Sequence, residues 1–528
     1  MKGWMKWGGY LGIISVVSLG CRLSSASLAV LCPSVVALLS IVLFRRTLVG
    51  LLVGVYAGML MLEPSVLMLP SRFIVDHLAP VLKSPWNLSV VGFTLLLAAF
   101  AAVLEAGGGF KRIMHRLLKT QPAARKRVEW GAFGLGLICF FDGLANSMLV
   151  GRTLSNTARS AGVSRARMAY IVDSTSSAVA CVALISTWIA YQLSMMQEGF
   201  LLAGAEPLVS LYQLFVYSIP YNFYCWFTLI LLAVSIQRDW YVGPMRNSRV
   251  EAADAGEESV EIDQAWAPAG AVGIPLTVLM FSLFLGLYVS GSGGMVLPQS
   301  IGDISTAFGK ADAARVLLRA AALALFVAVW MNRQFVRAQQ LKMRAVILSG
   351  VQKFLLPLLI LLSAWLLSSV LKSLDVHIVL GELLGTQLDE RLFPALVFIT
   401  GSLISFSTGT SWGTMGLLMP LVVPILLGFD DVSLERIAAS VAAVFSGAVF
   451  GDHCSPFSDT TIVASISCHV EPYTHVKTQL PYALLAAFAA LLLGFIPAGM
   501  LGIHPMVLLW VGLLILYVGV RVHQKVVP

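Results

Sequence analysis

Long apolar runs separated by short polar segments dominate the pattern of the chain. A run of about 17–25 apolar residues is long enough to cross the hydrocarbon core of a bilayer as a helix. The pattern therefore predicts an all-α polytopic membrane protein with about 12 transmembrane helices. The predicted crossings lie at residues 5–21, 23–43, 47–68, 86–109, 168–192, 211–235, 267–290, 314–331, 345–371, 437–467, 481–502 and 505–521.

Two further apolar stretches, 130–151 and 392–428, have like charges on both sides. Because loops rich in Lys and Arg stay in the cytoplasm, a simple crossing of 130–151 would place one basic loop outside. Each stretch is therefore predicted to be a re-entrant hairpin, and the two hairpins enter the membrane from opposite faces. The flanking charges are Lys111, Arg112, Arg116, Lys119, Arg125, Lys126, Arg127, Arg152, Arg159, Arg165 and Arg167 for the first stretch, and Asp375, Glu382, Asp389, Glu390, Asp430, Asp431 and Glu435 for the second.

Hairpins of opposite orientation indicate two inverted-topology repeats. A shift of 269 positions places Ser164 on Ser433 and Ser186 on Ser455, which is a faint echo of such a repeat. The predicted organisation is a set of N-terminal helices (1–84), a first repeat (85–235), a cytoplasmic linker (236–266), a second repeat (267–521) and a cytoplasmic tail (522–528).

Composition supports a membrane protein. Hydrophobic residues make up 58% of the chain and charged residues 12%, whereas a soluble surface needs roughly a quarter. The net charge of +8 lies mostly in short loops, so it orients the chain in the cell inner membrane and does not indicate nucleic-acid binding. The basic loop 332–344 and the tail are predicted to be cytoplasmic, as are both termini. A processing site at Ser18–Cys21 is an alternative to a first transmembrane helix, but the apolar span that follows at once favours the helix.

Ionisable groups inside apolar spans cost roughly 3 kcal/mol or more, so they are candidates for function. Asp142 stands midway along an apolar stretch, beside Gly143 and just before Asn146 and Ser147. This group predicts a cation or proton site at a hairpin tip. The alternative is that Asp142 only lies near a membrane surface.

A second cluster joins one carboxylate to several hydroxyls. Asp173 is followed by Ser174 and Thr175, and oxygen ligands of this kind suit Na+ or H+. The alternative for the hydroxyls is hydrogen bonding back to their own helix.

A third cluster interrupts an apolar stretch with Gly and hydroxyl residues. Breaks in a helix expose N–H groups that attract a carboxylate, while freed carbonyl groups coordinate a cation. The alternative is close helix packing through small residues. The candidate residues are Thr410, Ser411, Trp412 and Gly413.

The fourth cluster, within residues 447–461, has the densest polar content. Pro456 is expected to stop a helix there, and a histidine stands beside a carboxylate. Zinc ligation by adjacent residues is disfavoured because their side chains face different ways. The candidate residues are Asp452, His453, Ser455, Asp459 and Thr460.

Five runs resemble the NhaC family of sodium/proton antiporters, within the ion transporter superfamily. The runs are FDGLANSMLVGRTL, RMAYIVDSTSSAVACVALISTW, GTSWGTMGLLMPLVVPIL, SGAVFGDHCSPFSDTT and HVKTQLPYAL. The resemblance spans roughly residues 85–500. It implies a scaffold domain and a mobile transport domain that holds the two hairpins. It also implies an ion-site role for the residues that match motif positions, which are Asp142, Asn146, Asp173, Ser174, Thr175, Thr410, Ser411, Trp412, Asp452, His453, Ser455 and Asp459. The family commonly has a second aspartate and a tyrosine where this chain has Gly143 and Leu144, which removes an acid from the expected site.

The predicted function is secondary transport that exchanges Na+ for H+, with Asp142, Asp173, Asp452 and Asp459 as the Na+ ligands. Since burial favours the protonated form of a carboxyl group, protons are expected to displace Na+. Na+- or H+-coupled exchange of small organic anions or amino acids is the alternative, and a channel and a membrane enzyme are rival classes. The chain lacks the HExxH and GxxxxGK[ST] patterns, so no enzyme and no cofactor is predicted. The expected partners are small ions, an organic substrate and membrane lipid, and a homodimer stays open as the assembly.

Overall fold

The computed structural model describes residues 12, 14–22, 27–44, 46–63, 65, 67–118, 125–248, 266–294, 301–379, 389–429, 432–455 and 458–526. This part of the chain is helical, and it contains no strand. Most of the predicted linker, the acidic flanks at Glu382, Asp430 and Asp431, and Pro456 lie outside the described residues.

The first half holds a short helical segment at residues 14–22 and the elements up to Arg246. These are η1 (Ser27–Leu31), α2 (Cys32–Phe44), α3 (Thr47–Leu62), α4 (Leu69–Arg72), η2 (Phe73–Leu78), α5 (Ala79–Lys83), α6 (Pro85–Gly107), α7 (Gly109–Leu118), α8 (Arg125–Ile138), α9 (Gly143–Ser160), α10 (Arg165–Val182), α11 (Thr187–Ala203), α12 (Leu211–Ser218), η3 (Ile219–Tyr221), α13 (Phe223–Gln237) and η4 (Gly243–Arg246).

The second half continues in the same way. Its elements are α15 (Gly270–Ser292), α16 (Ile301–Lys310), α17 (Ala313–Ala338), α18 (Met343–Lys353), α19 (Leu355–Ser373), α20 (Val376–Val379), α21 (Phe393–Thr408), α22 (Ser411–Leu427), α23 (Leu434–Cys454), α24 (Asp459–Ser467), α25 (Pro472–Ala489), η6 (Ala490–Phe495), α26 (Ile496–Leu501) and α27 (Pro505–Val526).

Helices of membrane-spanning length are the main building blocks. Within the described residues, seven helices are long and apolar enough to cross a bilayer, or nine if each of two bent pairs counts as one span. The described residues contain no strand, and these apolar helices bury many apolar side chains. The chain is therefore an all-α integral membrane protein.

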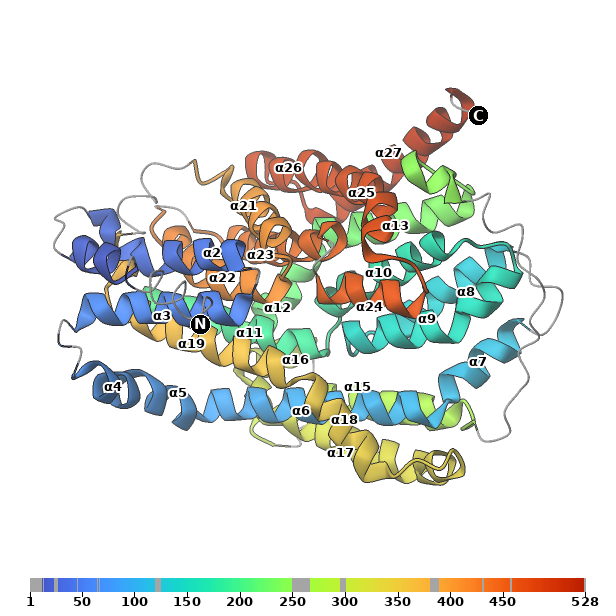
Figure 1. Cartoon of the computed structure of the whole chain (residues 1–528), viewed down its shortest axis with the longest axis horizontal. Coiled ribbons are helices and arrows are strands. Elements are labelled where there is room, and N and C mark those ends of the chain that lie inside the picture. Colours follow the sequence, from blue (N-terminus) through green and yellow to red (C-terminus); the bar gives the residue numbers. More distant parts are fainter. Residues whose placement is uncertain are drawn as a thin grey trace, which may run out of the picture.

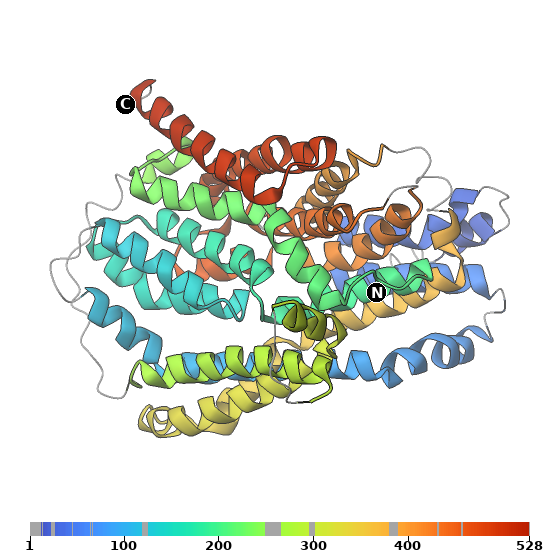
Figure 2. The same cartoon turned by 180° about the vertical axis from the view of Figure 1, so that it is seen from behind.

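The molecule is elongated, and different helix ends meet at the two ends of its long axis (Figures 1 and 2). At one end, Arg125 Nη2 lies 2.7 Å from Asp239 Oδ1, and Gln524 donates to the Arg238 carbonyl group. The start of α8 therefore lies beside the C-terminal ends of α13 and α27. We call this the basic end. At the opposite end, Arg436 Nη1 lies 3.0 Å from Glu390 Oε2, which ties the start of α23 to the segment before α21.

Two helical hairpins approach the middle of the molecule from these two ends (Figure 1). Helices α8 and α9 enter from the basic end and turn at residues 139–142, inside the predicted stretch 130–151. Helices α21 and α22 enter from the opposite end and turn at Gly409 and Thr410, inside the stretch 392–428. The predicted breaks in both stretches are confirmed. Gly409 has φ of 66°, a left-handed conformation that a residue without Cβ adopts at little cost.

Three predicted crossings are wrong as continuous helices. The stretch 211–235 holds α12 and α13, which bend by 45° at a short break. The stretch 168–192 holds α10 and α11, which are separated at residues 183–186 and bend by 48°. The side chain of Ser186 accepts a hydrogen bond from Ile189 N and so begins α11. The stretch 437–467 is likewise divided into α23 and α24 around residues 455–458. A helix stop was expected from Pro456 within 437–467, whereas apolar composition does not reveal the other breaks, because polar caps occur inside long hydrophobic runs.

Arg167 was predicted to be a loop charge after the first hairpin, and this is wrong. Its side chain is fully buried on α10, where Nε lies 3.2 Å from Oε1 of the equally buried Glu129 on α8. The rings of Tyr170 and Tyr241 stack near the guanidinium group. An ion pair with hydrogen-bonding geometry offsets the cost of burying both charges, and it joins the first hairpin to α10.

Candidate functional site

A cavity of about 40 Å³ lies where the two hairpin tips meet the broken helices. We call it the central cavity. A water molecule needs roughly 10–15 Å³ on this measure, so the space suits a few waters or a partly hydrated ion. The lining residues are Asp142, Leu144, Thr187, Trp188, Phe354, Pro357, Ile360, Gly409, Thr410, Ser411, Trp412, Asp452, Ser458, Asp459 and Thr460.

Four helices begin at this cavity. The first residues of α11, α22 and α24 belong to its lining, and α9 contributes its N-cap Asp142 and its second residue Leu144. Each helix start carries backbone N–H groups without partners inside the helix and a partial positive charge. The cavity therefore combines N–H donors with the carboxylates of Asp142, Asp452 and Asp459.

Asp142 holds two of these helices with one carboxylate. Oδ1 accepts a hydrogen bond of 2.6 Å from Ala145 N and so caps α9. Oδ2 accepts one of 2.8 Å from Thr187 Oγ1, the first residue of α11. The side chain is 2% exposed, so it is buried inside the protein.

Asp452 and Asp459 reach the cavity from either side of the break after α23. Asp452 Oδ1 accepts a hydrogen bond of 2.9 Å from Ser458 Oγ, which also lies 3.2 Å from Thr460 Oγ1. Asp452 is buried on the last turn of α23, whereas Asp459 begins α24 with an exposed side chain. The cavity thus receives acids from three different elements.

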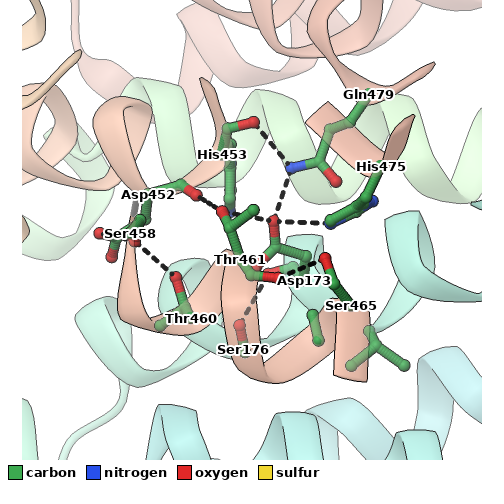
Figure 3. A network of polar contacts seen from close by, with 12 residues as sticks. Asp173, Ser176, Asp452, His453, Ser458, Thr460, Thr461, Ser465, His475 and Gln479 are labelled. Carbon is green, nitrogen blue, oxygen red and sulfur yellow. Dashed lines mark hydrogen bonds and ion pairs between the residues drawn. The ribbon is translucent and has the colours of Figure 1, made fainter. Parts of the chain in front are cut away.

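Asp173 lies behind the central cavity, in a buried polar network (Figure 3). Its Oδ2 accepts a hydrogen bond of 2.8 Å from Gln479 Nε2 and lies 3.2 Å from His475 Nε2. Its other oxygen, Oδ1, is buried without a hydrogen-bond partner among the described residues. The network therefore joins α10 to α25 around one carboxylate.

His453 belongs to the same network. Its Nε2 lies 3.1 Å from Ser177 Oγ and its Nδ1 lies 2.9 Å from the hydroxyl of Tyr224, while its carbonyl group accepts from Gln479 Nε2. Both ring nitrogens thus have partners on neighbouring helices. This arrangement fixes the ring and suits a group that passes or holds a proton.

Thr461 connects the network to the cavity. Its hydroxyl lies 3.4 Å from Asp173 Oδ2 and also donates to the backbone carbonyl group of Asp452 (Figure 3). One side chain therefore bridges the backbone of Asp452 and the carboxylate of Asp173.

The other predicted site residues occupy several positions. Asn146 Nδ2 donates to the carbonyl groups of Gly136 and Thr175, which closes the first hairpin against α10, and its Oδ1 has no partner among the described residues. The Thr175 hydroxyl bonds back to Ile171 O at 2.8 Å, as the alternative for that cluster predicted. Ser147 and Ser174 are buried on α9 and α10 and are absent from the cavity lining, and Ser455 is buried at the end of α23.

The second hairpin tip is held by its own hydroxyl and by an aromatic contact. Thr410 Oγ1 accepts a hydrogen bond of 3.2 Å from Gly413 N and so caps α22. The Tyr191 hydroxyl donates to Trp412 O at 2.5 Å, and the two rings have centroids 4.4 Å apart. These contacts fix the tip against α11.

Sequence reasoning missed His475, Gln479, Tyr224 and Thr187 as site residues. His475 and Gln479 are four positions apart in a predominantly apolar helix, so they face the same side. That spacing was a usable signal within the run HVKTQLPYAL.

Comparison with known proteins identifies the family of the chain. A family model described as the Na+/H+ antiporter family matches residues 179–499. The chain belongs to this antiporter family. It is therefore an integral membrane transporter of the Na+/H+ antiporter family.

Individual relatives of the antiporter are distant. An uncharacterised protein of Haemophilus influenzae is 25% identical over 490 residues, which cover 90% of this chain and 93% of that protein. The malate-2H+/Na+-lactate antiporter of Bacillus subtilis is 30% identical over 153 residues, 25% of this chain and 32% of that protein. The crystal structure of the Alcanivorax borkumensis YdaH transporter has a TM-score of 0.53 at 13% identity, covers 82% of this chain and 89% of its own, and shows a similar fold alone.

Proposed function

We propose that the protein exchanges Na+ for H+ across the cell inner membrane and that both ions use the central cavity. The observation that carries the proposal is the meeting of Asp142, Asp452 and Asp459, from three elements, around one space of about 40 Å³. Carboxylate and hydroxyl oxygens are the ligands that a hard cation prefers. Each carboxylate that binds Na+ also binds a proton, so the two ions compete.

We propose that the carrier alternates between its two ends by moving the hairpins. The hairpins approach the cavity from opposite ends, which is the arrangement expected of inverted repeats. Ser164 and Ser433, related by the shift of 269 positions, both cap the N-terminus of a helix, α10 and α23. Both helices end in a break beside the cavity, and this likeness supports two related halves.

In this proposal the Asp173 network holds a proton next to the ion site. Asp173, His453 and His475 are buried, and Thr461 links them to Asp452. Binding of Na+ at Asp452 disfavours a second positive charge nearby, so the network releases its proton as the ion enters. Neither ion is chemically altered, and no cofactor takes part.

Exchange of a small organic anion is the second candidate. Four helix N-termini at one cavity are a recognised setting for a carboxylate group. The Bacillus subtilis relative is a malate and lactate antiporter by name. However, about 40 Å³ holds only a few waters, so the cavity must widen before a dicarboxylate fits. The present geometry favours a small ion.

Replacement of Asp142 by Asn tests the proposal directly. Asn also caps helices, so Asp142→Asn removes the charge and retains the cap of α9. Since a hydrogen bond to a charged group contributes about 1.5–3 kcal/mol, Na+-driven proton movement in proteoliposomes should fall roughly tenfold or more. Asp76→Asn is the matched control, because Asp76 is an exposed carboxylate outside the cavity.

Two results would contradict the proposal. Wild-type proteoliposomes in which Na+ fails to dissipate an imposed pH gradient would exclude Na+/H+ exchange. Equal rates for Asp142→Asn and Asp76→Asn would remove Asp142 from the ion site. Counterflow of labelled malate under the same conditions would select the organic-anion candidate instead.

A further inference from the structure

A second and larger cavity lies between the first hairpin and the helices beneath it in Figure 1. Its volume is about 410 Å³, within the range of roughly 300–1,000 Å³ that ligand pockets occupy. Its walls come from α6, α7, α9, α18 and the connection between α17 and α18. Its charged lining residues are Glu105, Lys111, Arg152, Lys342 and Lys353. We call it the basic vestibule.

The basic vestibule lies about one helical turn from the central cavity. On α9, Leu144 lines the central cavity, whereas Met148 and Arg152 line the vestibule. Four residues of helix span about 6 Å. The same change occurs between the neighbours Lys353, which lines the vestibule, and Phe354, which lines the central cavity. A solute in the vestibule therefore lies within about one helical turn of the lining of the proposed ion site.

The charges of the vestibule are unbalanced. Four cationic side chains face one carboxylate, and the Lys353 Nζ to Glu105 Oε2 distance is 3.8 Å, long for an ion pair. Arg152 and Lys342 make no ion pair among the described residues, and Lys111 lies 5.8 Å from the Trp266 ring. The vestibule thus has an excess of positive charge that no described acid neutralises.

The need to orient the chain in the membrane does not explain why all four of these cationic residues are present. Basic residues that set topology act from loops. Arg152 lies in the third turn of α9 and Lys353 ends α18, one turn from the central cavity. Pathways for cations have acidic walls, and Arg and Lys walls select anions. The vestibule is therefore poorly suited to attract Na+.

We propose that the basic vestibule binds a small organic anion through carboxylate groups, at a site distinct from the central cavity. The cationic side chains bind the carboxylates, and the apolar wall of Ala102, Met148 and Leu149 packs against the carbon skeleton. An anion there competes with Glu105 for Lys353. The proposal does not depend on which ion the central cavity exchanges, so it stands or falls separately from Na+/H+ exchange.

Two kinds of molecule could supply an anionic group to the vestibule, namely a free carboxylate in water and an acidic lipid through its headgroup. We assign the site to the free carboxylate, because the connection of α17 to α18 at the basic end supplies part of the wall and a connecting segment there meets water. The test distinguishes both sources.

The test measures binding to the purified full-length chain in a neutral detergent. Succinate is titrated at fixed Na+ and fixed ionic strength, and thermal unfolding is followed, with sodium chloride as the reference. The expected result is a saturable rise of the unfolding temperature that chloride does not produce. Arg152→Gln should weaken the apparent succinate affinity roughly tenfold, as expected for the loss of a charged hydrogen-bonding partner.

Arg521→Gln is the matched control. It removes one exposed cation at the same end of the molecule, outside the vestibule, and should leave succinate affinity unchanged. Lys111→Gln is a second vestibule variant at an exposed position, should Arg152→Gln fold poorly. Its succinate affinity should also fall.

Three results would overturn the proposal. One is a succinate effect equal to that of chloride. Another is an equal response of Arg152→Gln and Arg521→Gln. The third is stabilisation by phosphatidylglycerol in nanodiscs, lost in Arg152→Gln, with none by succinate, which would assign the vestibule to a lipid headgroup.

Discussion

At the scale of single residues, each carboxylate of the site has a different structural task. Asp142 caps one helix and holds the start of another, whereas Asp452 binds the segment after its own helix. Asp173 has no role in capping and receives its partners from α25, about 300 positions away in the chain. A sequence shows that all three acids are unusual in an apolar span, because lipid penalises them. It does not show which partners each one meets, since those contacts depend on the packing of distant helices.

Gly143 is the residue at which this chain departs from the expected pair of aspartates. A Cβ there would lie 3.5 Å from Trp188 Nε1 and 3.6 Å from Ser176 O, which are ordinary contact distances. Neither space nor backbone conformation therefore requires a glycine. The fold therefore leaves room for a side chain, and for an acid, at this position.

Gly143→Asp should therefore strengthen Na+ binding. The new carboxylate would stand at the first residue of α9, beside the Trp188 wall of the central cavity, where a negative charge is also favourable to the helix. The apparent KM for Na+ in proteoliposomes should fall roughly fivefold, since one more charged ligand contributes about 1 kcal/mol or more. Gly143→Asn, of nearly equal size, should leave KM close to the wild-type value. Equal KM values for the two variants would show that a negative charge at position 143 does not affect Na+ binding.

At the scale of elements, the sequence predicts helix breaks well where charge or glycine marks them. The hairpin turns at residues 139–142 and 409–410 fall inside the two stretches that charge symmetry singled out. The break between α10 and α11 was missed, because the sequence there is a continuous apolar run with a serine cap. A hydrophobic pattern indicates that a segment is buried in lipid or protein, but it does not indicate a bend of 48° within that segment.

Close packing holds the second hairpin in place. Ser405 Oγ of α21 donates a hydrogen bond of 2.6 Å to Gly447 O of α23. A Cβ on Gly447 would lie 2.9 Å from Ser402 N and 3.0 Å from the Gly401 Cα. The two helices approach this closely only because Gly447 and Gly401 lack side chains.

Gly447→Ala should therefore separate α21 from α23 and destabilise the protein. Overpacking of this kind costs about 1–3 kcal/mol, and it displaces the hairpin whose tip lines the central cavity. Thermal unfolding in detergent should occur at a lower temperature for Gly447→Ala. Gly519→Ala on α27 is the control, because nothing lies within 4 Å of its added Cβ. An unfolding temperature of Gly447→Ala equal to that of Gly519→Ala would show that the α21 and α23 contact adapts freely.

At the scale of the whole molecule, segments that are far apart in the sequence gather at one end. The start of α8, the connection of α17 to α18 and the end of α27 lie at the same end in Figures 1 and 2. They are far apart in the sequence, and only hydropathy and charge placed them on one side of the membrane. The number of crossings was harder to predict, because α12 and α13 and also α10 and α11 are bent pairs that a count of apolar runs divides arbitrarily.

The basic end should face the cytoplasm, because loops rich in Lys and Arg are retained there during insertion. Green fluorescent protein fused after residue 528 should fluoresce, since it matures in the cytoplasm, and alkaline phosphatase at the same place should be inactive. The loop of Gly502–His504, between α26 and α27, lies at the other end of the single helix α27 and serves as the internal control. Reporters inserted in that loop should give the reverse result, since α27 is one of the helices long enough to cross the bilayer. An active phosphatase at the C-terminus would show that the basic end faces outside, and the basic vestibule would then take its anion from the outside of the cell.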